Sequence, residues 1–197
     1  PTRLIFGRGV VSEKLASVMN QYGKRVLITY GGGSIKRTAP GHDKSLYDLV
    51  KDTLTDKQVF ELGGIQPNPK FNPSVLDGVR MCQDNDIDVI LAVGGGSVLD
   101  CTKAIAGVAG TLKTKVTDNV EEAWDIVCGR KPTTAAVPIV DIITMAATGS
   151  EYDMGGVISR TETNDKLAYF SKLVFPAVSF IDPTYTFTLP DRKSTRL

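Results

Sequence analysis

Residues 88–105 read DVILAVGGGSVLDCTKAI, and this stretch decides the fold. Residues 88–93 are apolar almost throughout, as is typical of a central parallel strand that is covered on both faces. Three glycines, residues 94–96, end this strand, and apolar residues then recur at helical spacing over residues 97–108. A strand that passes through a glycine turn into a helix is the repeating unit of an α/β fold.

The same alternation of strands and helices continues on both sides of this stretch. Residues 25–30 form a second apolar strand, which three glycines also end. Residues 155–159 and 166–170 flank a polar turn and predict an antiparallel hairpin. The pattern predicts further strands over 59–62, 135–143 and 177–181, a short edge strand over 3–6, and helices over 44–54 and 74–84. The predicted fold class is therefore α/β, a Rossmann-like parallel sheet flanked by helices, with an added antiparallel hairpin.

Composition places the chain among ordinary globular proteins and excludes several kinds of partner. It has 197 residues, of which 42% are hydrophobic and 23% are charged. The net charge of +1 gives no bulk attraction to nucleic acid or to an anionic membrane. No apolar run approaches the ~18 residues that a membrane-spanning helix needs. We therefore expect a protein with no nucleic-acid partner and no membrane contact.

The cysteines and the single histidine limit the sites that the chain can form. Cys82, Cys101 and Cys128 are odd in number and lack C-x-x-C spacing. We therefore expect three reduced thiols in a cytoplasmic protein, with no disulfide framework and no zinc site. His42 alone excludes any site within the chain that needs two or three histidines, and we expect it to be a surface residue.

The two glycine runs are candidate phosphate sites. Glycine lets the backbone approach a ligand closely, and a helix start offers unpaired N–H groups, so residues 94–97 predict a pyrophosphate site. A tight turn with no ligand is the alternative. No acid follows residues 31–33, but Ser34, Lys36 and Arg37 do, and this combination suits a 2′-phosphate. A solvated basic turn is the alternative there.

Three other features are ambiguous by themselves. Residues 144–151 form a hydroxyl-rich loop after an apolar strand, which is typical of any turn capped by Ser or Thr. Asp100 and Lys103 lie three residues apart, as in many surface ion pairs, although Asp100 could also face the mouth of the glycine site. Lys166 lies in the middle of a predicted strand, and this position alone does not assign it to a binding site.

The motif G-G-G-S-x-x-D-x-x-K-A-I-A over residues 94–106 resembles the iron-containing (group III) alcohol dehydrogenase family. Residues 1–7 and 27–34 resemble one branch of it, the NADPH-dependent butanol dehydrogenases and broad-range aldehyde reductases. The glycine motif alone is shared with dehydroquinate synthases and glycerol-1-phosphate dehydrogenases, so a protein similar to these stays an alternative. Further stretches that agree with the family, in the same order, are 63–69, 147–151, 156–158 with Lys166, and 181–183 ending in 188–190.

The resemblance implies the cofactor-binding portion of an NADP(H)-dependent alcohol dehydrogenase or aldehyde reductase. Residues 1–190 are expected to form the dinucleotide-binding α/β domain. Residues 191–197 are expected to be the start of the helical metal-binding domain or a tail, with the all-helical metal domain itself absent. By this resemblance the pyrophosphate is held by Gly94, Gly95, Gly96 and Ser97, and the 2′-phosphate is held by Gly32, Gly33, Ser34 and Lys36. Asp100 and Lys166 lie near the nicotinamide and its ribose, and Asn68 lies at the adenosine side. The rest of the site is lined by Thr144, Thr148 and Tyr185.

The resemblance also implies a divalent metal, iron or zinc, held by one Asp and three His that all follow residues 188–190. The first of these ligands is expected beyond Leu197, so no catalytic or metal-binding residue is assigned in this chain. We therefore expect the chain to be inactive alone, and a non-catalytic dinucleotide-binding module is the alternative.

Two further expectations concern cofactor binding and assembly. Asp153 stands where the branch often has Asn, close to the expected nicotinamide, so its carboxylate is counted with the cofactor-binding residues and is expected to weaken binding or alter its pH dependence. The expected partners are a small alcohol or aldehyde and a second copy of the chain, because edge strands near the N-terminus pair across a dimer in this branch.

Overall fold

The computed structural model describes residues 1–188, and the expected domain boundary at residue 190 and the segment 191–197 lie outside the described residues. Its main feature is a six-stranded sheet in the order β1-β8-β5-β4-β2-β3, in which every neighbouring pair is parallel. The predicted fold class is thereby confirmed. The strands are β1 (Arg3–Phe6), β2 (Arg25–Tyr30), β3 (Gln58–Leu62), β4 (Val89–Gly94), β5 (Ile139–Ile143) and β8 (Val178–Ile181).

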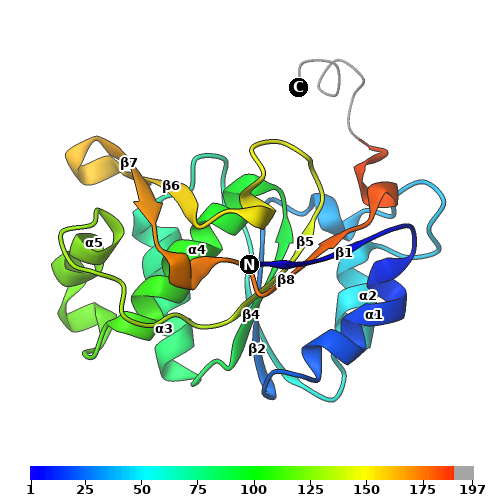
Figure 1. Ribbon diagram of the computed structural model, residues 1–197, viewed down its shortest axis with the longest axis horizontal. Coiled ribbons are helices and arrows are strands. Elements are labelled where there is room, and N and C mark those ends of the chain that lie inside the picture. The colour runs from blue at the N-terminus through cyan, green and yellow to red at the C-terminus, as the bar shows by residue number, and fades with distance from the viewer. Residues whose placement is uncertain (189–197) are drawn as a thin grey trace.

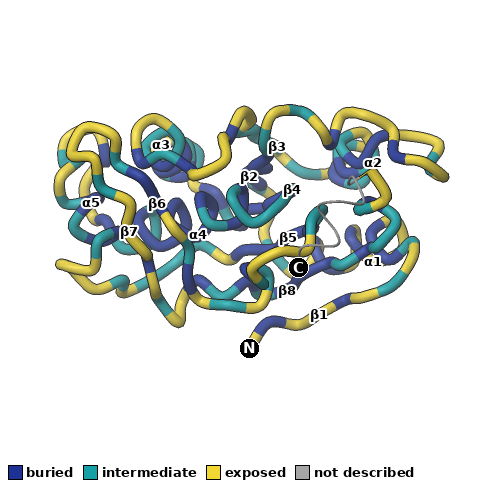
Figure 2. The backbone as a smooth tube through the Cα atoms, turned by 90° about the horizontal axis from the view of Figure 1, so that it is seen from above, coloured by how far each residue is buried: buried dark blue, intermediate teal, exposed yellow. Residues whose placement is uncertain are grey.

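Helices cover both faces of this sheet (Figure 1). On one face, α1 (Val10–Met19) and α2 (Leu46–Thr53) bury their apolar sides in one core cluster. On the other, α3 (Leu76–Asp84), α4 (Gly96–Thr111) and α5 (Val120–Val127) form a second cluster. Figure 2 shows the buried strands as the layer between these two groups of helices. The short helical turns are η1 (Ser34–Lys36), η2 (Phe71–Val75), η3 (Val116–Asp118), η4 (Ser150–Tyr152), η5 (Thr161–Thr163), η6 (Lys172–Val174) and η7 (Pro183–Thr186).

The order of the strands creates a switch point between β2 and β4. These two strands are neighbours, with Tyr30 beside Val93 at their carboxyl ends. The chain leaves β2 for α2 on one face and leaves β4 for α4 on the other (Figure 1). Open α/β sheets bind ligands outside the carboxyl ends of the strands at such a point. Both glycine runs lie there, which the sequence could not show.

The predicted hairpin is present and packs on α4. Strands β6 (Gly155–Arg160) and β7 (Asp165–Phe170) pair antiparallel as a separate two-stranded sheet. Gly156 allows its close approach to the helix, because a Cβ there would lie 2.9 Å from the Cα and Cβ of Asp100.

The structure differs from the sequence predictions at two helices and one strand. Helices α1 and α5 were not predicted, and the strand expected over 135–143 begins only at Ile139. All three cysteines are free, as expected. No helix in the described part of the chain has the length and apolar character that crossing a bilayer requires.

Candidate functional site

The turn between β4 and α4 leaves the start of a long helix open. Helix α4 has 16 residues and begins at Gly96, and no side chain caps its first N–H groups. A Cβ on Gly94 would lie 2.7 Å from the Cγ2 atom of Val98, so the turn is too tight for a larger residue. Open N–H groups and the positive end of the helix dipole together favour an anion at this position.

The glycine run after β2 lies beside this turn. A Cβ on Gly31 would be 3.7 Å from the Val98 side chain, at the beginning of α4. A Cβ on Gly32 or Gly33 would meet nothing within 4 Å, so this backbone is open. Gly33 has a φ of 101°, a left-handed conformation that glycine adopts without strain. The structure therefore brings the two predicted phosphate sites together.

An aromatic and charged cluster borders the second glycine run. The exposed Lys36 ammonium lies 5.0 Å from the ring centre of Tyr30 and 4.7 Å from that of Tyr47. Glu61 on β3 accepts hydrogen bonds from Lys51 at 2.5 Å, from Tyr47 at 3.0 Å and from Tyr30 at 3.1 Å. Burial acts to raise the pKa of Glu61, but the bonds from Lys51 and Tyr47 outweigh it and lower that pKa. Glu61 is thus an ionised carboxylate that its neighbours already satisfy.

The loop after β5 reaches the first glycine turn from the other side. The Thr144 N–H donates to the Gly94 carbonyl at 2.9 Å. The Thr148 hydroxyl lies 3.7 Å from where a Cβ on Gly96 would stand. Both threonines therefore lie next to the glycine turn.

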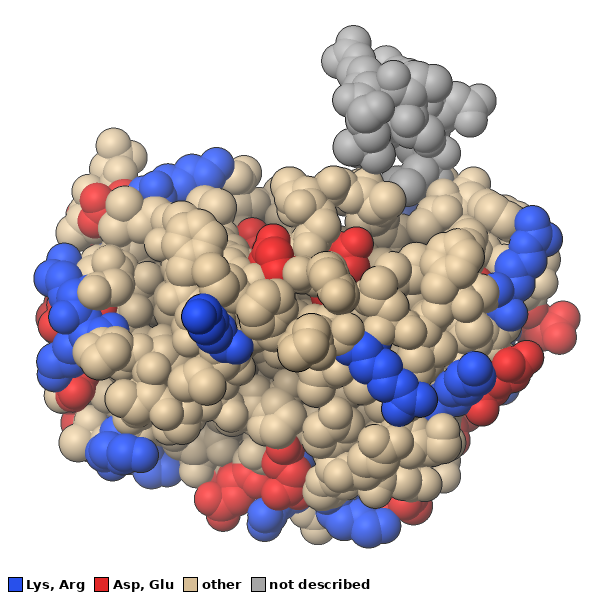
Figure 3. All heavy atoms as spheres, viewed as in Figure 1, with Lys and Arg blue, Asp and Glu red and all other residues tan. Residues whose placement is uncertain are grey.

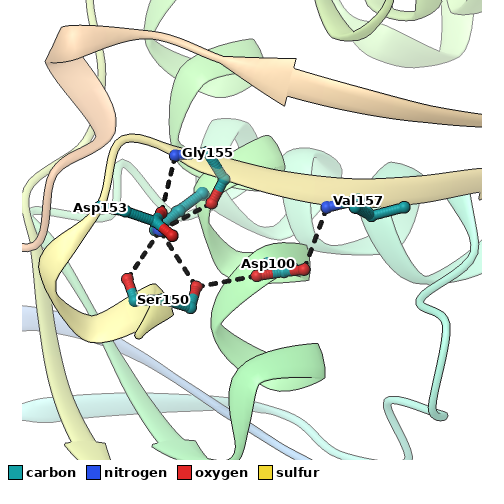
Figure 4. Close-up of polar contacts among 6 residues, drawn as sticks. Asp100, Ser150, Asp153, Gly155 and Val157 are labelled. Carbon is teal, nitrogen blue, oxygen red and sulfur yellow. Dashed lines mark hydrogen bonds and ion pairs between the residues drawn. The ribbon is translucent and has the colours of Figure 1, made fainter. Parts of the chain in front are cut away.

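Asp100 faces this loop and the hairpin, not Lys103. Its carboxylate accepts from the Ser150 hydroxyl at 2.8 Å and from the Val157 N–H at 3.0 Å (Figure 4). A surface ion pair between Asp100 and Lys103 is therefore the wrong interpretation, since Lys103 is fully buried.

Lys103 is a functional candidate that the sequence did not reveal. Its ammonium donates to the backbone carbonyls of Ser150 and Gly155, each at 2.7 Å, and to Asp153 at 2.5 Å. Asp153 also accepts from the Gly155 N–H at 2.9 Å, while its side chain stays 48% exposed. The available signal was the set of apolar residues around Lys103 on α4, namely Cys101, Ala104, Ile105 and Ala106.

The remaining predicted residues form two separate contacts. The Lys166 ammonium on β7 donates to the Asn68 side-chain oxygen at 2.7 Å, and both residues are exposed. Tyr185 is buried and stacks on His42 with ring centres 4.3 Å apart. The His42 Nε2 atom lies 2.8 Å from the Thr184 hydroxyl oxygen. His42 is thus partly exposed, and it also packs against a predicted cofactor residue, which the sequence did not indicate.

The comparison with protein families agrees with this geometry. Residues 1–183 match the model of the iron-containing alcohol dehydrogenase family. This chain belongs to that family. Among residues 1–188, no group of three or more His, Cys, Asp or Glu side chains is placed to hold a metal ion.

Similar members of the family differ in the cofactor that their names give. The chain is 47% identical over 192 residues to a probable NADH-dependent butanol dehydrogenase of Bacillus subtilis, covering 96% of this chain and 46% of that protein. It is 40% identical over 193 residues to the NADPH-dependent aldehyde reductase YqhD of Escherichia coli, covering 98% of this chain and 46% of that protein. The chain thus spans about half the length of these curated relatives.

Solved structures of the family share the fold. The crystal structure of Escherichia coli YqhD superposes with a TM-score of 0.82 at 41% identity, covering 98% of this chain and 46% of that one. The NADH-dependent butanol dehydrogenase A of Thermotoga maritima superposes with a TM-score of 0.85 at 36% identity, with the same coverage.

Proposed function

We propose that this chain is the cofactor-binding portion of an NADP(H)-dependent alcohol dehydrogenase or aldehyde reductase. The observation that carries the proposal is the meeting of two glycine turns at the switch point, where the uncapped start of α4 opens. Residues 94–97 supply N–H donors for a pyrophosphate, and the open backbone at Gly32 and Gly33 leaves room for the adenosine end. When bound, the nicotinamide supplies or accepts the hydride that interconverts a small primary alcohol and its aldehyde.

The metal belongs to this proposal only for a longer protein. Iron or zinc, held by residues outside this chain, is proposed to polarise the alcohol or carbonyl oxygen. The part of the chain that the structure describes contributes the residues around the cofactor: Asp100, Thr144, Thr148, Asp153, Lys166 and Tyr185.

Three features favour NADP(H) over NAD(H). An NAD-binding site usually has an acid that accepts hydrogen bonds from the ribose hydroxyls. Ser34 and Lys36 follow β2 instead, and both residues are exposed. Glu61, the acid of this cluster, is already bonded to Lys51, Tyr47 and Tyr30, so it offers little to a ribose. A 2′-phosphate suits a hydroxyl and a cation.

Fluorescence titration of the chain with NADPH and with NADH tests this preference. We expect tighter binding of NADPH. Replacing Lys36→Met removes a charge-assisted contact of about 1.5–3 kcal/mol, so NADPH affinity should fall at least about tenfold while NADH affinity changes little. The control is Lys24→Met, which removes an exposed lysine paired with Asp56 just before β2. Equal binding of both cofactors, or no effect of Lys36→Met, contradicts the NADP assignment.

An activity assay separates the enzyme from its alternatives. With butyraldehyde, NADPH and added Fe²⁺ or Zn²⁺, we expect no turnover by the 197-residue chain. Metal-dependent turnover would show that ligands lie within these residues. A longer version that carries the remaining length of the relatives should turn over. If that version binds NADPH yet stays inactive, a non-catalytic dinucleotide-binding module is the better description.

A further inference from the structure

We propose that Lys103 is a positioning residue that fixes the loop between β5 and β6 against α4, and thereby sets Asp100 for the nicotinamide end of the cofactor. This inference rests on the proposed function. Lys103 lies in the second turn of α4, the helix that begins at the glycine turn, and its side chain is 0% exposed. A buried ammonium is costly unless it is paired and fully hydrogen-bonded.

The surroundings of Lys103 meet that requirement entirely from one segment. Its acceptors are the Ser150 and Gly155 carbonyls, the Asp153 carboxylate, and the Ser150 hydroxyl at 3.1 Å. All of them belong to η4, the residue after it, or the first residue of β6 (Figure 4). A single side chain of α4 therefore holds the whole turn that follows Thr144 and Thr148.

The Ser150 hydroxyl passes this constraint on to Asp100. An ammonium has three N–H donors and no acceptor, so the Ser150 hydroxyl, its fourth and longest contact at 3.1 Å, cannot donate to it and directs its single proton elsewhere. That proton is donated to Asp100 at 2.8 Å, and the Val157 N–H holds the second oxygen of the same carboxylate. Lys103 thus sets the direction of the Ser150 proton and, through it, the orientation of Asp100.

The same ammonium balances the charge of Asp153. One oxygen of Asp153 is bonded to Lys103 and to the Gly155 N–H, and the side chain remains half-exposed. The Asp153 carboxylate is therefore half of an ion pair. Its charge is offset by the Lys103 ammonium, which leaves the exposed part of the carboxylate as a hydrogen-bond acceptor.

The test compares the two ends of the cofactor. Lys103→Met keeps a side chain of similar length but removes every donor. We expect its affinity for NADPH to fall at least about tenfold, while its affinity for 2′,5′-ADP, which lacks the nicotinamide half, stays within about twofold. We also expect the fluorescence of bound NADPH to shift toward that of the free cofactor. General damage to the fold would weaken both ligands alike and would overturn the proposal.

Two further variants keep the test decisive. The control is Lys115→Met, which removes an exposed lysine paired with Asp84 and should change neither affinity. If Lys103→Met does not fold, Ser150→Ala decides, because it removes only the hydroxyl that links Lys103 to Asp100. It should weaken NADPH several-fold and spare 2′,5′-ADP, and unchanged NADPH affinity would overturn the positioning role.

Failure of this inference differs from failure of the proposed function. If the unaltered chain binds neither NADPH nor 2′,5′-ADP, the proposed function fails. If it binds both and Lys103→Met binds both equally well, only the role of Lys103 fails.

Discussion

Asp141 is a buried acidic residue in the centre of the sheet. It lies on β5 and is 1% exposed, with one oxygen accepting from the Ser179 hydroxyl at 2.7 Å. Among residues 1–188, no group hydrogen-bonds its other oxygen. Burial raises the pKa of Asp141 well above that of an ordinary carboxyl, although the bond from Ser179 opposes this. The folded chain therefore holds Asp141 neutral at a pH where the unfolded chain ionises it.

The free energy of unfolding that the protein loses by burying Asp141 should increase with pH. Below the ordinary pKa of about 4, both states are protonated and nothing is lost. Above it the unfolded state releases a proton that the folded state keeps, so folding becomes less favourable as pH rises toward the raised pKa. Asp141→Asn copies the neutral acid and should raise the melting temperature at pH 7 by a few degrees, with little change near pH 4.

Asp88→Asn is a control of opposite sign for this measurement. The Arg25 N–H bond to Asp88 lowers the pKa of that carboxyl, so its stabilising effect is present at pH 7 and lost as pH falls through the lowered pKa. Asp88→Asn should therefore lower the melting temperature at pH 7. Calorimetry across pH 4–8 compares the two variants, and an Asp141→Asn effect that does not change with pH contradicts the neutral state.

Single residues could be predicted where the backbone alone decides their place. Gly94–Gly96 and Thr144 follow strands, and strand ends of a parallel sheet share one edge, so the sequence indicated this shared edge but not the contact between them. Lys103 could not be placed in this way, because a lysine on a helix is usually exposed. Its burial depends on a loop about fifty residues later that supplies the acceptors. The partial burial of His42 likewise depends on Tyr185, which lies far from it in the sequence.

At the scale of elements, α4 is fitted closely to the segment before β5. A Cβ on Gly110 would lie 2.6 Å from the backbone N and Cα of Ala136. Backbone atoms cannot move aside as a flexible side chain can. Gly110→Ala should therefore destabilise the fold by about 1–3 kcal/mol through overpacking, even though alanine favours helices by about 1 kcal/mol.

Gly96→Ala at the other end of α4 is the matched control. The nearest atom to its added Cβ is the Thr148 hydroxyl at 3.7 Å, an ordinary contact. Urea unfolding without cofactor should show a lower midpoint for Gly110→Ala and an unchanged or higher one for Gly96→Ala. If Gly110→Ala is as stable as the unaltered chain, the close packing of this segment on α4 is wrong.

The same packing explains which elements the sequence predicted well. The predicted apolar runs coincide with the observed strands at β2 and β4, because these strands are buried on both faces. The run over 135–143 begins early because its first residues lie against the end of α4, where the Val137 N–H donates to the Ala106 carbonyl. Helices α1 and α5 also have apolar residues at helical spacing, so their pattern was present in the sequence but was not recognised.

At the scale of the whole molecule, the candidate site is assembled from segments that follow five strands, β2, β3, β4, β5 and β8, together with Lys166 on β7. Their proximity is a property of the strand order, so it required the topology as well as the motifs. On the face shown in Figure 3, acidic and basic side chains are interspersed, with uncharged areas between them. Exposed aromatic residues include Phe6 at 72% and Phe170 at 66%. Such apolar surface favours association with other chains.

Strand β1 is the expected place of association between two copies of the chain. Among residues 1–188 it pairs with β8 alone, and the Arg3 and Gly7 N–H groups donate to the carbonyls of Ala177 and Ile181 on that side. Alternate residues of a strand donate to the same side, so the Leu4 and Phe6 N–H groups point away from β8 toward a further strand.

We therefore expect sedimentation velocity to show a dimer whose formation depends on concentration. Leu4→Pro deletes one outward donor without touching the bonds to β8, and proline is tolerated on edge strands, so this variant should shift the population toward monomer. Leu4→Ala removes the exposed side chain but keeps the donor, and it should weaken the dimer less. An unaltered chain that stays monomeric at all concentrations contradicts the dimer. Equal dimerisation of Leu4→Pro instead places the interface away from β1, on another exposed apolar surface such as that around Phe170.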